Sequence, residues 1–186
     1  MIDALSPTEL QTLFPQLFGS TPTAQLEALA DRLEPQTIAA GRAIVQRGTP
    51  SGSLVLLVDG KLLVSITEGS RKLEMAEVGP GEWVGEVAFL DGGDATTDVT
   101  ASERSRILVM SPASFDRLCE ENPRVARDLL HALCTRLSAR VRRTARLLHD
   151  EGVGGSWRTA PLDVQKGQQG SWLDRIRHSL YRHAQE

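Results

Sequence analysis

The sequence predicts an α+β fold: a small antiparallel β-roll, similar to a jelly roll, flanked by N-terminal helices and followed by a long C-terminal helix. Between residues 43 and 110, glycines separate short apolar or alternating runs at near-hairpin spacing, which is typical of antiparallel strands. On either side of this region, helix-start signals precede apolar residues spaced three or four apart. Together these patterns predict one domain in residues 1–150.

Two short helices are expected first. Ser6-Pro7-Thr8-Glu9 has the sequence of a capping box with proline at the first helical position, and Thr21-Pro22-Thr23 precedes the second helix. After Pro35 the pattern changes to that of strands. Strands are expected at residues 43–46, 54–58, 61–67, 72–78 and 107–110, with Trp83-Val84 as a shorter extended piece.

Two helices follow the strands. Ser111-Pro112 is a start signal for a helix that ends near Glu121, and Asn122-Pro123 interrupts it. A long helix is then expected over about residues 123–150. Because this helix outlasts the diameter of a small roll, its apolar stripe favours pairing with a second copy of the chain in a homodimer. The apolar positions expected at the dimer contact are Leu130, Leu133, Leu137, Val141 and Leu148.

The segment from Gly81 to Ala101 has the features of an anion site. Gly85 marks a place where the backbone bends, and residues 85–90 have the length of about one helical turn. The first amides of such a turn have no intrahelical partner and point outward as donors to an anion. Glu86 is placed to accept a hydrogen bond from a sugar hydroxyl. The alternative is a strand-turn-strand corner in which Glu86 caps exposed amides.

The same segment resembles the cyclic-nucleotide-binding domain of catabolite activator protein and of protein kinase A regulatory subunits. Val84-Gly85-Glu86-Val87-Ala88-Phe89-Leu90 matches the first half of that family's phosphate-binding cassette, and Val99-Thr100-Ala101 matches its end without a gap. The resemblance covers about residues 14–149. It implies a nucleotide pocket and a long helix that closes over the ligand. The ligand-binding residues expected from it are Gly85, Glu86, Val87, Ala88, Ala95, Thr96 and Thr97.

The cassette departs from the family pattern at three positions. Ala95 stands where the family has its phosphate-binding arginine, Asp94 where it has proline, and Asp98 where it has a small hydroxyl residue. A phosphate in a partly dry pocket needs a countercharge, since a hydrogen bond to a charged group contributes about 1.5 to 3 kcal/mol. Ala95 supplies none, and either aspartate would add a like charge if it faced the pocket. Arg104 and Arg106 are candidate replacements or simply solvated residues.

These observations predict a non-enzymatic regulatory module with a degenerate cassette, which does not bind cyclic AMP tightly and acts through its dimer and a protein partner. The alternative is a genuine sensor of a cyclic nucleotide or related nucleotide with altered specificity. Apolar side chains filling the Glu86 region would favour the first hypothesis, and an open cleft would favour the second. The sequence contains no Walker loop and no pattern typical of Ser/His/Asp or Cys/His catalysis, and no metal site is expected.

Charge is distributed unevenly along the chain. Residues 1–123 carry 9 Lys+Arg and 18 Asp+Glu, a balance of −9, whereas residues 124–186 carry 12 and 6, a balance of +6. The basic C-terminal third therefore favours an acidic protein partner, or nucleic acid bound without sequence specificity. Alternatively, its arginines form a solvated surface near the C-terminal end of the long helix. The basic residues of that helix are Arg136, Arg140, Arg142, Arg143 and Arg146.

Residues 151–186 are too few for the winged helix-turn-helix that follows the long helix in transcription factors of the family, which argues against sequence-specific DNA binding. Residues 151–170 are rich in glycine and predict a flexible linker. Residues 171–186 predict a short basic amphipathic helix that docks on its own dimer, in the groove of a partner or, less favourably, on a membrane surface. Its apolar side consists of Trp172, Leu173, Ile176 and Leu180.

The chain is expected to be cytoplasmic. Its first five residues lack the basic and apolar regions of a secretory signal, and the sequence has no apolar run of 18 residues. Cys119 and Cys134 fall on predicted helices and are expected to be buried thiols in a reducing compartment.

Overall fold

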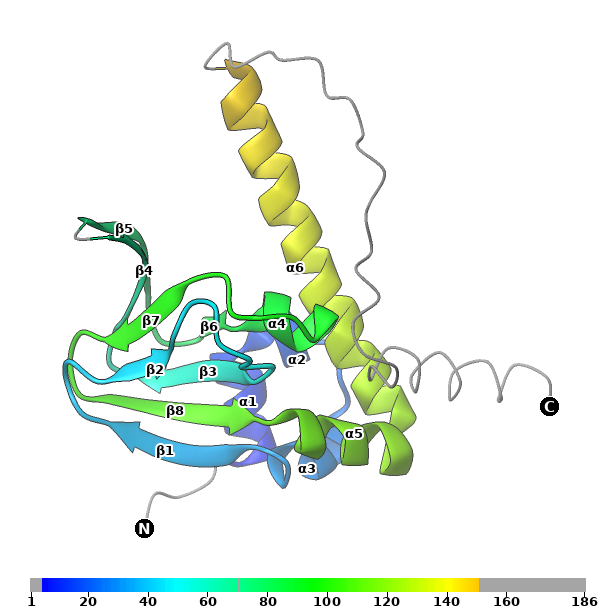
Figure 1. Ribbon diagram of the computed structural model, residues 1–186. Coiled ribbons are helices and arrows are strands. Elements are labelled where there is room, and N and C mark those ends of the chain that lie inside the picture. Colours follow the sequence, from blue (N-terminus) through cyan, green and yellow to red (C-terminus); the bar gives the residue numbers. More distant parts are fainter. Residues whose placement is uncertain (1–4, 70, 151–186) are drawn as a thin grey trace.

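The computed structural model describes residues 5–69 and 71–150, which form a β-roll of two sheets with helices packed against one of them (Figure 1). The helices are α1 (Pro7–Leu13), α2 (Pro15–Phe18), α3 (Thr23–Ala30), α4 (Glu86–Asp91), α5 (Pro112–Glu121) and α6 (Pro123–Asp150). The strands are β1 (Glu34–Ile38), β2 (Ala43–Val45), β3 (Leu54–Asp59), β4 (Leu62–Glu68), β5 (Arg71–Val78), β6 (Trp83–Val84), β7 (Asp98–Ala101) and β8 (Ser105–Met110). The predicted fold class is confirmed.

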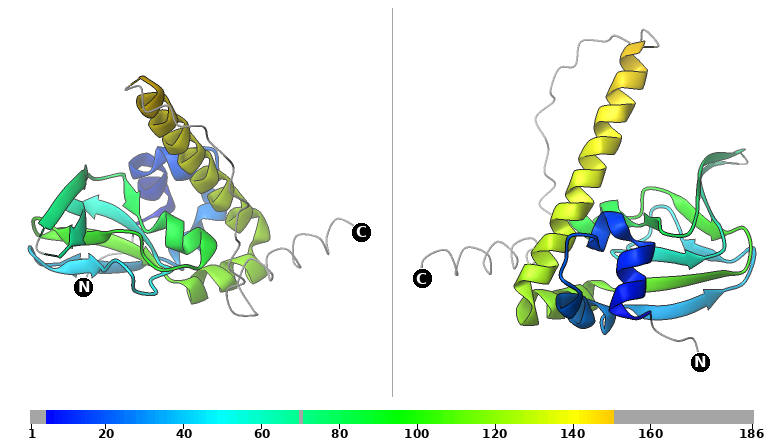
Figure 2. Two further views of the ribbon diagram at one scale, coloured as in Figure 1. Left: turned by 45° about the horizontal axis from the view of Figure 1, so that its top comes forward. Right: turned by 180° about the vertical axis from the view of Figure 1, so that it is seen from behind.

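Neighbouring strands in both sheets pair antiparallel. The first sheet has the order β1-β8-β3-β6, and the second has the order β2-β7-β4-β5. In the first sheet, Leu56 lies opposite Leu108 on one side and opposite Trp83 on the other. Figure 2 shows from behind how α1 to α3 lie beside the lower part of α6, where their side chains share a core with the first sheet.

The apolar run in β3 is continuous because both faces of this strand are buried. Leu54 and Leu56 belong to the core shared with the helices, whereas Val55 and Leu57 belong to a second core between the two sheets. Successive side chains of a strand point to opposite faces. A strand placed between two apolar layers therefore needs an apolar residue at each position.

The sequence-predicted helix caps are present in the structure. Ser6 Oγ accepts from the Glu9 amide at 3.3 Å, and Glu9 Oε2 accepts from the Ser6 amide at 2.8 Å, which completes the capping box of α1. Ser111 Oγ accepts from the Ser114 amide at 3.1 Å and caps α5. These bonds satisfy amides that a helix leaves unpaired at its start.

Two strands, β1 and β7, are absent from the sequence-based prediction. β1 lies at the edge of the first sheet, where it pairs with β8, and its residues are exposed or only partly buried. Pro35 is tolerated there because one side of an edge strand needs no backbone partner. β7 lies inside the second sheet, but its four residues are too few to show a clear alternating pattern. Short or exposed strands therefore escape prediction from hydrophobic periodicity.

Helix α6 has two parts with different environments. Its first turns are buried against the domain through Val125, Ala126 and Leu129, and its later turns project away from the body of the domain (Figure 1). The residues expected at a dimer contact are divided between these parts. Leu133 is fully buried in the domain's own core, Leu130 and Leu137 are partly buried, and Val141 is 66% exposed; the Leu148 side chain lies outside the described structure.

Leu133 therefore serves the domain core, which corrects its assignment to the dimer contact. The expected linker at 151–170 and the tail helix at 171–186 lie outside the described residues, so Trp172, Leu173, Ile176 and Leu180 stay predictions, as does the domain boundary at residue 150. Within the described ranges, no helix is long and apolar enough to cross a membrane.

The two cysteines differ in exposure, and the expectation that both are buried is wrong. Cys119 is partly buried, and this burial, together with the nearby carboxylates of Asp116 and Glu120, raises the pKa of its thiol to about 11. Cys134 is exposed on α6. A raised thiol pKa lowers the fraction of reactive thiolate at neutral pH.

Candidate functional site

Gly85 sets the geometry of the candidate site at the junction of β6 and α4. Its φ of +87° lies in the left-handed region, and a Cβ at this position would lie 2.3 Å from the Ser53 carbonyl oxygen. Glycine alone fits this backbone without strain. The chain consequently turns from β6 directly into α4, whose N-terminus has no side-chain cap from the described residues. The predicted helical turn is confirmed, and the alternative of a strand-turn-strand corner is wrong.

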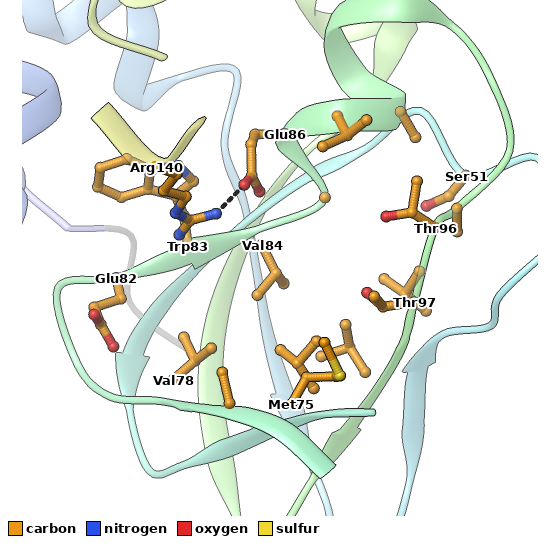
Figure 3. Close-up of a pocket in the computed structure, with 18 of the residues that line it drawn as sticks. Ser51, Met75, Val78, Glu82, Trp83, Val84, Glu86, Thr96, Thr97 and Arg140 are labelled. Carbon is orange, nitrogen blue, oxygen red and sulfur yellow. Dashed lines mark hydrogen bonds and ion pairs between the residues drawn. The ribbon is translucent and has the colours of Figure 1, made fainter. Parts of the chain in front are cut away.

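A cavity of about 750 Å³ lies beside α4, between the second sheet and α6 (Figure 3). Part of its wall is apolar, with Val64 and Met75 contributed by the second sheet. Figure 3 shows Glu86 on one side of the cavity and the hydroxyls of Thr96 and Thr97 on the opposite side. The lining includes the whole predicted ligand set: Gly85, Glu86, Val87, Ala88, Ala95, Thr96 and Thr97.

Glu86 is a buried carboxylate whose partner comes from a distant part of the chain. The residue is 6% exposed, and its Oε1 forms an ion pair with Arg140 Nη1 of α6 (Figure 3). Burying a charged group without a partner costs several kcal/mol, so this contact satisfies a group that α4 places out of water. The ion pair also connects the projecting helix to the cavity.

Two arginines of α6 line the cavity. From the sequence they are expected only on the basic surface of the long helix. Arg140 and Arg143 belong to the lining, and the Arg136 guanidinium lies 5.7 Å from the centroid of the Trp83 ring. These arginines are spaced four and three residues apart and therefore share one side of the helix. Arg142, although exposed, is not among the described lining residues.

The spacing of positions 136, 140 and 143 is the sequence signal that separates these arginines from Arg142, which is not three or four residues from any of them. Arg146, three residues after Arg143, continues the same spacing. This spacing alone identifies a helix face. It does not identify the cavity, because the local sequence says nothing about which residues that face meets.

The three cassette positions that differ from the family pattern do not all face the cavity, contrary to the expectation of like-charge repulsion there. Ala95 is 6% exposed and lines the cavity, so the position of the family arginine carries no charge. Neither Asp94 nor Asp98 is among the described lining residues, and the expected like-charge repulsion at the cavity is not supported. Arg104 and Arg106 are also outside the described lining, so they do not replace the arginine.

Asp98 turns away from the cavity because it has hydrogen-bond donors elsewhere. Its Oδ1 accepts from the Arg47 amide at 2.9 Å, and its Oδ2 accepts from the Thr67 hydroxyl at 2.9 Å. These bonds, the Arg47 amide first, hold the pKa of the Asp98 carboxyl below its ordinary value. Asp98 therefore joins the loop after β2 to β4 within the second sheet.

We expect Asp98 to make the domain more stable at neutral pH than in acid. Because its pKa is lowered on folding, the contribution is fully present above the unfolded value of about 4 and is lost as pH falls through the lowered folded pKa. Asp98→Asn should therefore reduce the free energy of unfolding more at pH 7 than in acid below about pH 3. Urea unfolding at both pH values measures this, and an equal loss at both would contradict the assignment.

Comparison with known proteins agrees with this geometry. Residues 35–122 match the sequence model of the cyclic nucleotide-binding domain. This region is a cyclic nucleotide-binding domain. A cyclic nucleotide-binding domain from Methylobacillus flagellatus superimposes with a TM-score of 0.70 at 19% identity, covering 81% of this chain and 88% of that chain. At that identity the likeness establishes the fold alone.

Curated relatives match this chain over part of their own length. The cyclic AMP receptor protein of Thermus thermophilus is 32% identical over 107 residues, which are 57% of this chain and 48% of that protein. Acetyltransferase Pat of Mycolicibacterium smegmatis is 29% identical over 134 residues, which are 67% of this chain and 39% of that protein. The chain thus matches less than half of the length of either relative.

Proposed function

We propose that this chain is a cytoplasmic, non-enzymatic regulatory module whose cavity binds a cyclic nucleotide, with a specificity different from that of cassettes that carry the arginine. One observation carries this proposal: the Glu86 region borders an open cavity of about 750 Å³, which the apolar side chains of the described residues leave unfilled. A filled region would have favoured the ligand-free module that sequence analysis placed first. The geometry favours its alternative, a sensor.

The chemistry of the cavity suits a ribose phosphate. Its volume falls within the range of about 300 to 1,000 Å³ that is typical of small-molecule sites. Glu86 supplies a carboxylate that accepts from ribose hydroxyls, and Thr96 and Thr97 supply hydroxyls that donate to a phosphate. The apolar side chains of Val64 and Met75 provide a surface for a base.

We also propose that the module acts as a homodimer with a protein partner. Val141, on the projecting part of α6, is 66% exposed, and a second α6 packed along it would remove it from water. Arg142 and Arg146 on the same helix are exposed and offer charge to an acidic protein. Sequence-specific DNA and membrane surfaces are the less favoured partners.

Calorimetric titration of the full chain with cyclic AMP, cyclic GMP and cyclic dinucleotides tests the proposal. We expect the natural chain to bind at least one of these ligands with a micromolar dissociation constant. Ala95→Arg is the matched control, because it restores the countercharge that the cassette lacks. If the natural chain binds none of them but Ala95→Arg binds cyclic AMP, the cavity has lost its ligand and the ligand-free assembly module is the correct function.

A further inference from the structure

We propose that Arg140 and Arg143 of α6 replace the absent cassette arginine and bind the anionic group of the ligand. This inference rests on the proposed function, since it concerns how the same cavity holds a nucleotide. Ala95 leaves the usual position of the countercharge empty, and the described cavity lining contains two guanidinium groups, both from α6. The residues that determine affinity therefore lie outside the cassette.

The charges around the cavity show which groups are available to an anion. Three carboxylates of the described residues line it, and each already has a partner. Glu77 forms an ion pair with Lys61 at 3.3 Å, and Glu82 Oε2 accepts from the Gly79 amide at 2.8 Å. Glu86 is paired with Arg140. Arg143 lines the cavity and forms no ion pair with any residue of the described ranges, so none of those residues competes with a ligand for its charge.

Arg140 reaches the ligand by exchanging its partner. Its side chain is 60% exposed while that of Glu86 is 8% exposed, so the arginine has room to move and the carboxylate does not. When ribose hydroxyls donate to Glu86, that buried carboxylate keeps its hydrogen bonds and Arg140 is released. Arg140 then turns from Glu86 toward the phosphate, where it meets a charge that the ribose hydroxyls do not supply.

This exchange links the cavity to the projecting helix. Without ligand, the ion pair between Glu86 and Arg140 holds α6 against α4. With ligand, the phosphate replaces Glu86 as the anion that Arg140 and Arg143 contact. Val141 lies between these arginines in the sequence. Binding of a ligand in the cavity therefore changes the contacts of the same part of α6 that is proposed to pair with a second copy.

Substitution of the two arginines by glutamine tests the inference in the full chain, with cyclic AMP and cyclic GMP as probes in calorimetry. We expect Arg140→Gln and Arg143→Gln each to weaken binding about tenfold and the double variant about a hundredfold, the size of lost hydrogen bonds to a charged group. Arg142→Gln is the matched control, since Arg142 is exposed on the same helix and is outside the described lining; it should change affinity by no more than about twofold. Circular dichroism confirms that each variant is folded.

Adding Ala95→Arg to the double variant completes the test. If the α6 arginines perform the role of the cassette arginine, a cation restored at position 95 should recover binding to about the natural level. If the natural chain binds a probe and the double variant binds it as tightly as Arg142→Gln does, the inference is overturned while the proposed function stands. If the natural chain binds neither probe nor a cyclic dinucleotide, with or without binding by Ala95→Arg, both are overturned.

Discussion

Gly85→Ala should destabilise the domain by about 3 kcal/mol and abolish nucleotide binding. A residue with a side chain is strained at a φ of +87°, and the added Cβ would lie 2.3 Å from the Ser53 carbonyl oxygen. That oxygen belongs to the backbone, so relief requires the loop before β3 or the start of α4 to move. Either movement displaces Glu86 and the amides beside it from the cavity.

Gly41→Ala is the matched control for this prediction. Gly41 also has a positive φ, +79°, but a Cβ there would meet no atom within 4 Å. The control should therefore cost only the backbone strain, about 1 kcal/mol, and leave binding intact. Urea unfolding and calorimetry of both variants measure the difference. Equal losses would show that the close approach to Ser53 does not constrain the site.

Leu133→Ala should reduce the free energy of unfolding by about 2 to 5 kcal/mol, whereas Val141→Ala should change it by less than about 0.5 kcal/mol when the chain is monomeric. Leu133 is fully buried in the core that joins α6 to the domain, and its truncation leaves a cavity. Val141 is 66% exposed and contributes little to that core. Urea unfolding at low protein concentration measures both changes.

The same two variants should have the opposite order of effects on association. If a second α6 covers Val141, Val141→Ala raises the dissociation constant of the dimer, and sedimentation equilibrium over a range of concentrations detects this. Leu133→Ala should alter association only as far as it unfolds the domain. A natural chain that stays monomeric at all concentrations would contradict the proposed homodimer, while leaving the stability prediction unaffected.

The local sequence predicts those parts of the domain whose structure depends on contacts between residues close together in the chain. The capping box at Ser6 depends on neighbouring atoms, so residue type and spacing predict it. At Gly85 the residues alone leave a strand-turn-strand corner open, and the resemblance to the family favours the helical turn that the structure contains. β1 is not predicted because an edge strand needs neither apolar alternation nor freedom from proline, so its sequence lacks the signal of a buried strand. The long apolar run of β3 was predicted, although its burial on both faces follows only from the assembled layers.

The candidate site also contains some features that the local sequence predicts and others that it does not. The cassette residues from Gly85 to Thr97 are predicted from the resemblance of this continuous segment to the family's cassette, and the structure gathers all of the predicted set around one cavity. The contact between Glu86 and Arg140 joins residues 54 positions apart, and no local pattern encodes it. Asp98 shows the converse case: its register in the cassette suggested the cavity, but donors from Arg47 and Thr67 hold it elsewhere.

Hydrogen-deuterium exchange of the full chain, with and without saturating cyclic AMP or cyclic GMP, tests the central claim most directly. If a cyclic nucleotide occupies this cavity, amides of residues 85–88 should exchange more slowly with the ligand present, and exchange in residues 136–143 of α6 should change as well. The amides of β1, on the far edge of the first sheet, serve as an internal reference and should exchange at the same rate in all samples. Unchanged exchange at residues 85–88 with both nucleotides would contradict the account.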